Sequence, residues 1–170
     1  MEPSILTPLF TLVPSAFFDK GRSRELLSGV ACLDGAHKVD SIELPGFGAV
    51  LVYAVAENTS VYPENNVSGK EALLPEIFHI LESLQDCSEY NKILCSWAGG
   101  YLYMAIAQGA SLMMANAFAA RDFTTAQYHI FNALKSLQLN PEVSVISWRI
   151  PLEEKDEMSL YRYFKSVERL

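Results

Sequence analysis

The sequence lacks most of the patterns that identify a particular chemistry. Its three cysteines, Cys32, Cys87 and Cys95, are widely spaced and odd in number, which excludes a disulfide framework and a CxxC or zinc pattern. Its three histidines are isolated, and it contains no Walker motif and no GxGxxG sequence. The unpaired cysteines and the absence of a signal peptide predict a reducing cytoplasm.

Charge is also scarce, and most of it is acidic. Only 19% of the residues are charged, and the net charge is −7. An acidic surface repels phosphate backbones, and the densest basic cluster (Lys20, Arg22 and Arg24) is ordinary for a solvated helix face. Half of the residues are apolar. We therefore expect no nucleic-acid partner, and we expect extra apolar surface to be buried against a protein partner or a second copy as a homodimer.

Long uninterrupted apolar runs are absent as well. The longest apolar stretch, Ile93 to Phe118, is broken by glycines at turn spacing. A membrane helix needs about 20 consecutive apolar residues, so this stretch predicts buried strands and no membrane partner.

The second half of the chain is the most regular part. Its six periodic segments are Lys92–Trp97, Tyr101–Gln108, Ser111–Phe118, Phe123–Leu137, Val143–Ile150 and Glu154–Val167. The first three are strand-like and joined by glycine turns, the fourth and sixth are amphipathic helices, and the fifth is a strand. This βββαβα order is that of the ribonuclease H-like and actin-like folds. We predict an α/β protein with a mixed sheet and flanking helices.

The residues that carry chemistry in those folds are missing here. Their first hairpin holds an aspartate that binds a metal or a phosphate, whereas this chain reads Leu94-Cys95-Ser96-Trp97. The three central strands contain no Asp or Glu, so a two-metal nuclease site is not expected. Asp122 stands alone at a helix start, where capping is the default role.

Two other functional readings stay open beside a non-catalytic module. The Gly99-Gly100 turn could bring backbone N–H groups to a nucleotide, although a Gly-Gly pair between apolar strands is usually a hairpin turn. An enzyme using Cys95 or His129 is the third reading, against a buried thiol and a packed imidazole. His37 and His79 have no second ligand at metal spacing. The sequence therefore predicts no catalytic, cofactor-binding or metal-binding residue and no cofactor.

The first half is less regular. Thr7–Val13 predicts a strand, and Asp19 predicts the cap of a short helix that ends by Gly29. Lys38–Leu44 and Gly48–Ala56 predict a hairpin around Pro45-Gly46. The remaining predictions are an exposed loop over Glu57–Gly69 and a helix running from Glu71 through Leu84 with Pro75 in its first turns. We divide the chain into a strand-rich subdomain (1–57), a loop and connecting helix (58–90) and a ribonuclease H-like half (91–170), with one continuous domain as the alternative.

Three phrases resemble an uncharacterised family of Bacteroidetes proteins. They are Leu12–Asp19, Met114–Phe118 and the segment from Phe123 through Asn140-Pro141. The resemblance implies a ribonuclease H-like fold related to actin-like proteins, and it carries over no catalytic residue. Members of that family are longer at the N-terminus, so the chain is expected to be a short member, a fragment or a separate offshoot. If strands are missing, dimerisation would cover the exposed sheet edge.

The leading functional prediction is a non-catalytic ribonuclease H-like or actin-like module that mediates protein–protein or self-association. The alternative is a protein that binds a nucleotide or a small ligand without hydrolysing it.

Overall fold

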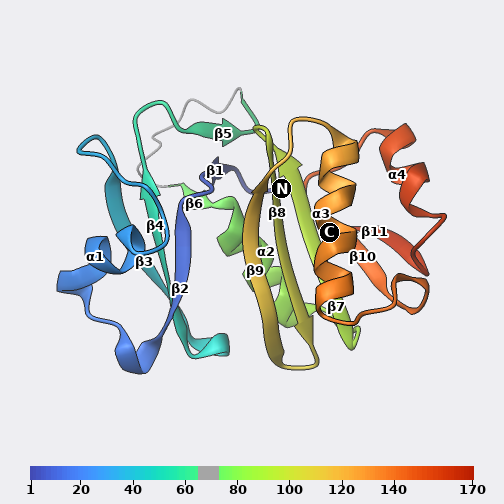
Figure 1. The fold of residues 1–170 in the computed structure, drawn as a ribbon, viewed down its shortest axis with the longest axis horizontal. Coiled ribbons are helices and arrows are strands. Elements are labelled where there is room, and N and C mark those ends of the chain that lie inside the picture. Colours follow the sequence, from blue (N-terminus) through green and yellow to red (C-terminus); the bar gives the residue numbers. More distant parts are fainter. Residues whose placement is uncertain (65–72) are drawn as a thin grey trace. The chain divides into compact units, whose positions relative to one another are not determined.

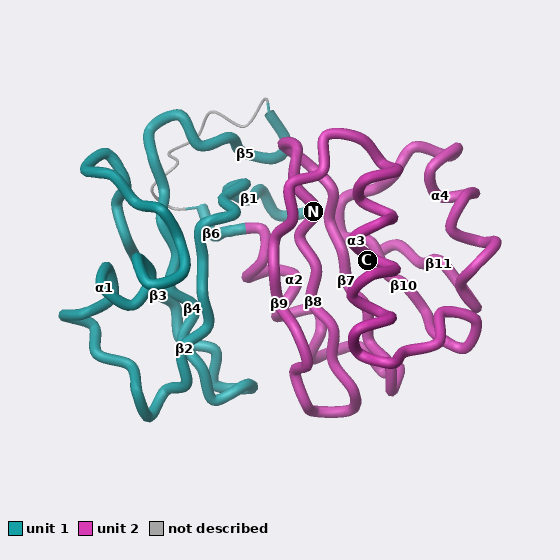
Figure 2. Tube along the Cα trace, viewed as in Figure 1, with its two compact units in different colours: residues 1–75 teal, residues 76–170 magenta. Residues whose placement is uncertain are grey.

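The computed structural model describes residues 1–64 and 73–170. The chain forms two compact units, Met1–Pro75 and Glu76–Leu170 (Figure 2). The helix that the sequence analysis placed in the connecting segment 58–90 belongs to the second unit.

The second unit is built on a five-stranded mixed sheet (Figure 1). Its strands are β7 (Asn91–Ala98), β8 (Tyr101–Gln108), β9 (Ser111–Ala119), β10 (Val145–Trp148) and β11 (Ser166–Arg169). They lie in the order β11-β10-β7-β8-β9. β7, β8 and β9 form an antiparallel meander, whereas β10 runs parallel to β7 and to β11. The predicted βββαβα order and the mixed α/β fold are confirmed.

Helices cover both faces of this sheet. α3 (Phe123–Ser136) packs on one face, where alternate strand residues such as Cys95 and Met104 join its apolar stripe in one core. α2 (Glu76–Asp86) contacts β7 and β8 on the other face. The predicted helix cap is confirmed, because the Asp122 carboxylate accepts a hydrogen bond from the Thr125 N–H at 2.8 Å.

The end of the chain differs from its prediction. The stretch Glu154–Val167 was expected to be one helix, but α4 (Glu154–Leu160) stops after seven residues and β11 follows. Val167 is buried as a strand residue opposite Ile146 of β10. The helical spacing of Leu160, Phe164 and Val167 is satisfied by a helix, a turn and a strand, all of which face the same core. Periodicity over a short window therefore favoured the wrong element.

The first unit contains two three-stranded sheets. One has the order β2-β4-β3, from β2 (Phe10–Pro14), β4 (Ala49–Val55) and β3 (Lys38–Leu44), and is antiparallel. Its core packs against α1 (Ser23–Ser28). The predicted hairpin of β3 and β4 is confirmed, and Gly29 ends α1 as predicted. Among the described residues, single turns of 3-10 helix lie between these elements at Ser15–Phe17, Lys20–Arg22 and Pro45–Phe47, and another, Pro141–Val143, lies in the second unit.

The other small sheet was not predicted. β1 (Ser4–Leu6) pairs with β5 (Ser60–Tyr62) and with β6 (Leu74–Pro75). β5 lies inside the predicted loop Glu57–Gly69. Leu74 and Pro75 form the strand β6, although a helix was predicted at these residues. Residues 65–72 of the predicted loop and helix lie outside the described residues. Among the helices that the structure does describe, none is long and apolar enough to cross a membrane.

Candidate functional site

A buried ion pair lies beside the end of β7, where the sequence predicted no aspartate. Ser96, near the end of β7, donates a hydrogen bond to Glu76 Oε1 at 2.5 Å. Arg149, directly after β10, donates from Nη1 to Glu76 Oε2 at 2.5 Å. All three side chains are buried. We call Glu76, Ser96 and Arg149 the Glu76 centre.

The fold positions this centre through backbone pairing and a helix start. The Arg149 N–H donates to the carbonyl of Cys95 at 3.0 Å, which places the residue beside the end of β7. Glu76 is the first residue of α2, where negative charge is favoured. Because a guanidinium already holds the carboxylate, the centre is suited to joining α2 to the sheet rather than to holding a cation. Within residues 1–64 and 73–170, no group of three His, Cys, Asp or Glu residues is placed to bind a metal ion.

Tyr103 lies beside this centre. It is opposite Ser96 across β7 and β8, and it is fully buried. Burial, and after it the Glu76 carboxylate, raises the pKa of Tyr103 far above its ordinary value, so the phenol stays neutral. Its hydroxyl has no hydrogen-bond partner within the described part of the chain.

The Gly99-Gly100 turn is explained by its own backbone. Both glycines have positive φ, 60° and 78°, as a two-residue type I′ hairpin requires. The Gly100 carbonyl accepts a hydrogen bond from the Ala120 N–H at 2.8 Å, and the Trp97 indole donates to the Ala120 carbonyl at 2.8 Å. The hairpin is thereby fixed to the segment that leads into α3.

The other candidate residues are packed as structural side chains and not as reactive groups. Burial raises the pKa of the Cys95 thiol far above its ordinary value, so it is not a nucleophilic thiolate. The His129 ring stacks on Phe118 with centroids 4.8 Å apart, and its Nε2 lies 3.2 Å from the Ala119 carbonyl oxygen. His79 is buried on α2 against the ring of Phe78.

β9 is an edge strand of the five-stranded sheet. None of its nine residues is charged, and most are partly or fully exposed. Met113 is 42% exposed. Among the described residues, β8 is the only strand paired with β9. We call the outer side of this strand the β9 edge.

A pocket of about 990 Å³ opens in the first unit. Its polar lining residues are Asp34, His37, Lys38, Asp40, Tyr53, Glu57 and Asn58, and its apolar ones include Ile5, Val55 and Leu73. We call it the unit 1 pocket. No pattern in the sequence marks this pocket, because its charged residues come from separate segments and His37 is isolated in the sequence.

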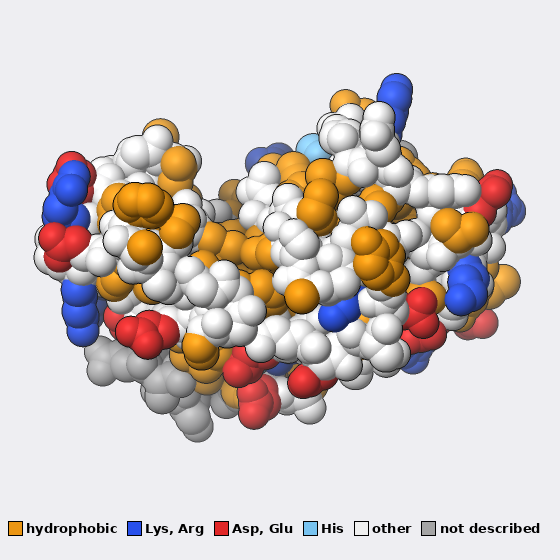
Figure 3. Space-filling view, turned by 90° about the horizontal axis from the view of Figure 1, so that it is seen from below, with side chains coloured by type: hydrophobic (Ala, Val, Ile, Leu, Met, Phe, Trp, Pro, Cys, Tyr) orange, Lys and Arg blue, Asp and Glu red, His pale blue; other side chains and the backbone are white. Residues whose placement is uncertain are grey.

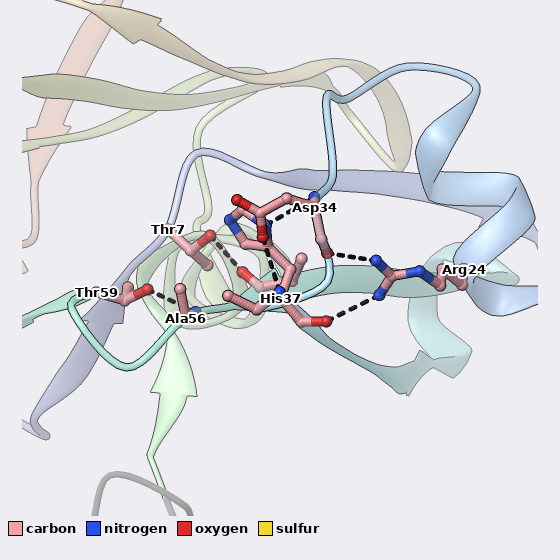
Figure 4. A network of polar contacts seen from close by, with 8 residues as sticks. Thr7, Arg24, Asp34, His37, Ala56 and Thr59 are labelled. Atoms are coloured by element: carbon pink, nitrogen blue, oxygen red, sulfur yellow. Dashed lines mark hydrogen bonds and ion pairs between the residues drawn. The ribbon is translucent and has the colours of Figure 1, made fainter.

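The walls of the unit 1 pocket are held by a polar network (Figure 4). The Arg24 guanidinium donates to the carbonyls of His37 at 2.8 Å and Asp34 at 2.5 Å. His37 Nδ1 lies 2.8 Å from Asp34 Oδ1. The Ala36 N–H, and next to it His37, holds the pKa of Asp34 below its ordinary value, so its charge persists at neutral pH.

One face of the molecule shows how its charged side chains are distributed. On the face drawn in Figure 3, Lys and Arg side chains occur in small groups beside Asp and Glu, separated by hydrophobic side chains. Such a face presents no broad basic stripe to a phosphate backbone.

Comparison with known proteins bears on the fold and the family. A solved structure from Bacteroides thetaiotaomicron VPI-5482, described as a protein with actin-like ATPase fold and unknown function, aligns with a TM-score of 0.75 at 18% identity. The alignment covers 97% of this chain and 66% of that one, so the chain spans just under two thirds of that protein's length. At this identity the likeness shows the actin-like fold alone. No curated protein matches the chain. A family model described as protein of unknown function (DUF3822) matches residues 5–167. The chain, which has an actin-like fold, therefore belongs to the DUF3822 family of proteins of unknown function.

Proposed function

We propose that this protein is a non-catalytic actin-like module that associates with a second copy of itself through the β9 edge. The observation that carries the proposal is a nine-residue edge strand with no charged side chain. Exposed strand edges present unpaired N–H and C=O groups, and proteins that stay monomeric usually protect them with charge, proline or short length.

The two edges of the sheet differ in this respect. β11 has four residues, two of them charged, and Arg169 is paired with Glu157. Such an edge resists addition of another strand. β9 is more than twice as long and has neither charge nor proline. The asymmetry favours β9 as the edge that takes a partner.

β9 is also compatible with itself. β9 has a bulge at Met113, which has no partner on β8, and is regular from Met114 to Ala119. In an antiparallel pair related by a two-fold axis at Asn116, Met114 would face Phe118 and Ala115 would face Ala117. No like charges meet in this register, and apolar cross-strand pairs each contribute about 0.2–1 kcal/mol. A closed two-fold dimer is the commonest form of self-association.

The association is tested by sedimentation velocity on the full chain from about 1 to 200 μM, a range suited to a micromolar dimer. We expect a species near twice 18.9 kDa that grows with concentration. Met113→Lys places a charge at the β9 edge and is expected to weaken the dimer by at least about tenfold. Met158→Lys is the matched control, because Met158 is exposed on α4, at 59%. A chain that stays monomeric throughout, or a dimer equally insensitive to both variants, would contradict the proposal.

We also propose the cytoplasm as the location. Cys32, Cys87 and Cys95 are free thiols, which supports a reducing compartment.

A further inference from the structure

We propose that the unit 1 pocket binds a small organic cation, an amine with a short apolar or aromatic body. The proposal concerns the first unit and does not rest on self-association through β9. Binding of a small ligand was the alternative function that the sequence left open, and this proposal gives it one site and one class of ligand.

The charge of the lining selects a cation. Asp34 and Asp40 contribute two carboxylates and Lys38 contributes one ammonium group, and the carboxylate of Glu57 adds to the acidic side of the lining. A pocket with this excess attracts cations and repels phosphates and carboxylates. At 990 Å³ the pocket is large enough for a small organic molecule with its hydration.

A tyrosine in the lining gives independent support for a ligand. Tyr53 lines the pocket and is only 6% exposed as a whole, and its hydroxyl makes no hydrogen bond to any described residue. The hydroxyl is not one of the buried polar atoms that lack a partner, so it opens into the pocket. A donor or acceptor bound in the pocket would pair with it. Burial, with Asp40 as the second cause, raises the pKa of Tyr53, so the phenol is neutral and can both donate and accept.

Asp40 lies where it can share a ligand with Tyr53. The two residues face each other across β3 and β4, so their side chains lie on the same face of the sheet. Asp40 Oδ1 accepts a hydrogen bond from the Ser41 N–H at 2.7 Å. In the described part of the chain the other carboxylate oxygen has no hydrogen bond, so it is available to an ammonium N–H.

The pocket is organised before a ligand arrives. Arg24 fixes the carbonyls of the segment 34–37 from one side (Figure 4). On the other side, the Thr59 hydroxyl accepts a hydrogen bond from the Ala56 N–H at 2.9 Å and closes the turn after β4. Thr7 donates to the Ala54 carbonyl at 2.7 Å and ties the chain after β1 to β4. Preformed walls reduce the entropy lost on binding. The apolar lining residues, Ile5, Val55 and Leu73, suit the body of the ligand.

Three probes of nearly equal size and different charge test the class of ligand. They are 2-phenylethylamine, 2-phenylethanol and phenylacetate, titrated into the isotopically labelled full chain and followed by amide chemical shifts. We expect saturable shifts in residues 34–40 and 53–58 with the amine, at a dissociation constant of about 1 mM, which is ordinary for so small a molecule. The alcohol and the acid are expected to bind at least about tenfold more weakly.

Two variants test the residues. Asp40→Asn keeps the shape and removes the charge, and it is expected to weaken amine binding by about three- to tenfold. Glu43→Gln is its matched control, because Glu43 lies on the same strand, is also exposed and does not line the pocket. Tyr53→Phe is expected to weaken binding by about threefold while the pocket shifts persist. The proposal is overturned if no probe saturates below about 10 mM, if the acid or the alcohol binds as well as the amine, or if Asp40→Asn and Glu43→Gln have the same effect.

Discussion

Removing Arg149 from the Glu76 centre should cost much of the protein's stability. Arg149→Met keeps an unbranched apolar chain of similar reach and deletes the guanidinium. Glu76 is fully buried, and one of its oxygens is held by Nη1 of Arg149. The variant therefore takes a compensating cation away from a buried carboxylate.

The magnitude follows from the burial of both partners. Breaking a buried ion pair by removing one side costs about 3–5 kcal/mol, a large share of the 5–15 kcal/mol that typically stabilises a domain. For a chain of this size, each kcal/mol lowers the melting temperature by about 2–4 °C, so we expect a fall of about 6–20 °C. If unfolding follows two transitions, the fall belongs to the second unit.

A double-mutant cycle separates the charge effect from lost packing. Glu76→Gln with Arg149→Met removes both charges and leaves an amide oxygen that still accepts the hydrogen bond from Ser96. The double variant should recover at least about half of the loss seen with Arg149→Met alone, as measured by urea unfolding. A loss below about 1 kcal/mol in the single variant, or no recovery in the double one, would refute this account of the centre.

Three further predictions concern single features. Asp122→Ala should lower the melting temperature at pH 7. The Thr125 N–H holds the pKa of Asp122 below its ordinary value. The stabilisation from the carboxylate is therefore present above about pH 4 and is lost as the pH falls through the lowered pKa. At about pH 3 the melting temperatures of the variant and the wild type should differ by less than at about pH 7. Cys95 should be the slowest of the three thiols to react with a maleimide in the native protein, because it is fully buried whereas Cys32 is exposed. Fast labelling of Cys95 would contradict this and would favour the reading in which Cys95 is a catalytic thiol. MgATP should leave the melting temperature unchanged, because the positive φ angles of Gly99 and Gly100 are those that a hairpin turn requires. If MgATP did bind, a concentration of a hundred times its dissociation constant would add about 2.7 kcal/mol to the free energy of unfolding and would raise the melting temperature by several degrees.

The parts of the fold that the sequence predicts are those with strong local signals. β7, β8 and β9 combine apolar runs with glycine turns, and α3 combines a helical stripe with the Asp122 cap. β1, β5 and β6 have two or three residues each and exist only because distant segments pair. No local pattern marks such strands.

The same limit applies to the candidate sites. Glu76 and Arg149 are 73 positions apart, and neither stands in a recognisable motif. The lining of the unit 1 pocket comes from Ile5 of β1, the segment 34–40, the residues around the end of β4 and Leu73. By contrast, the β9 edge was within reach of the sequence, because a nine-residue run without charge can be read directly.

The Glu76 centre shows how buried polar groups beside the end of β7 are satisfied by one another. A buried polar group without a partner destabilises the protein. Here a serine on β7, a carboxylate from the start of α2 and a guanidinium after β10 satisfy one another. The interaction joins a helix to two strands that the chain brings together from distant positions. The pair therefore gives the second unit a structural reason to carry polar residues at this position, and their polarity is not by itself evidence of catalysis.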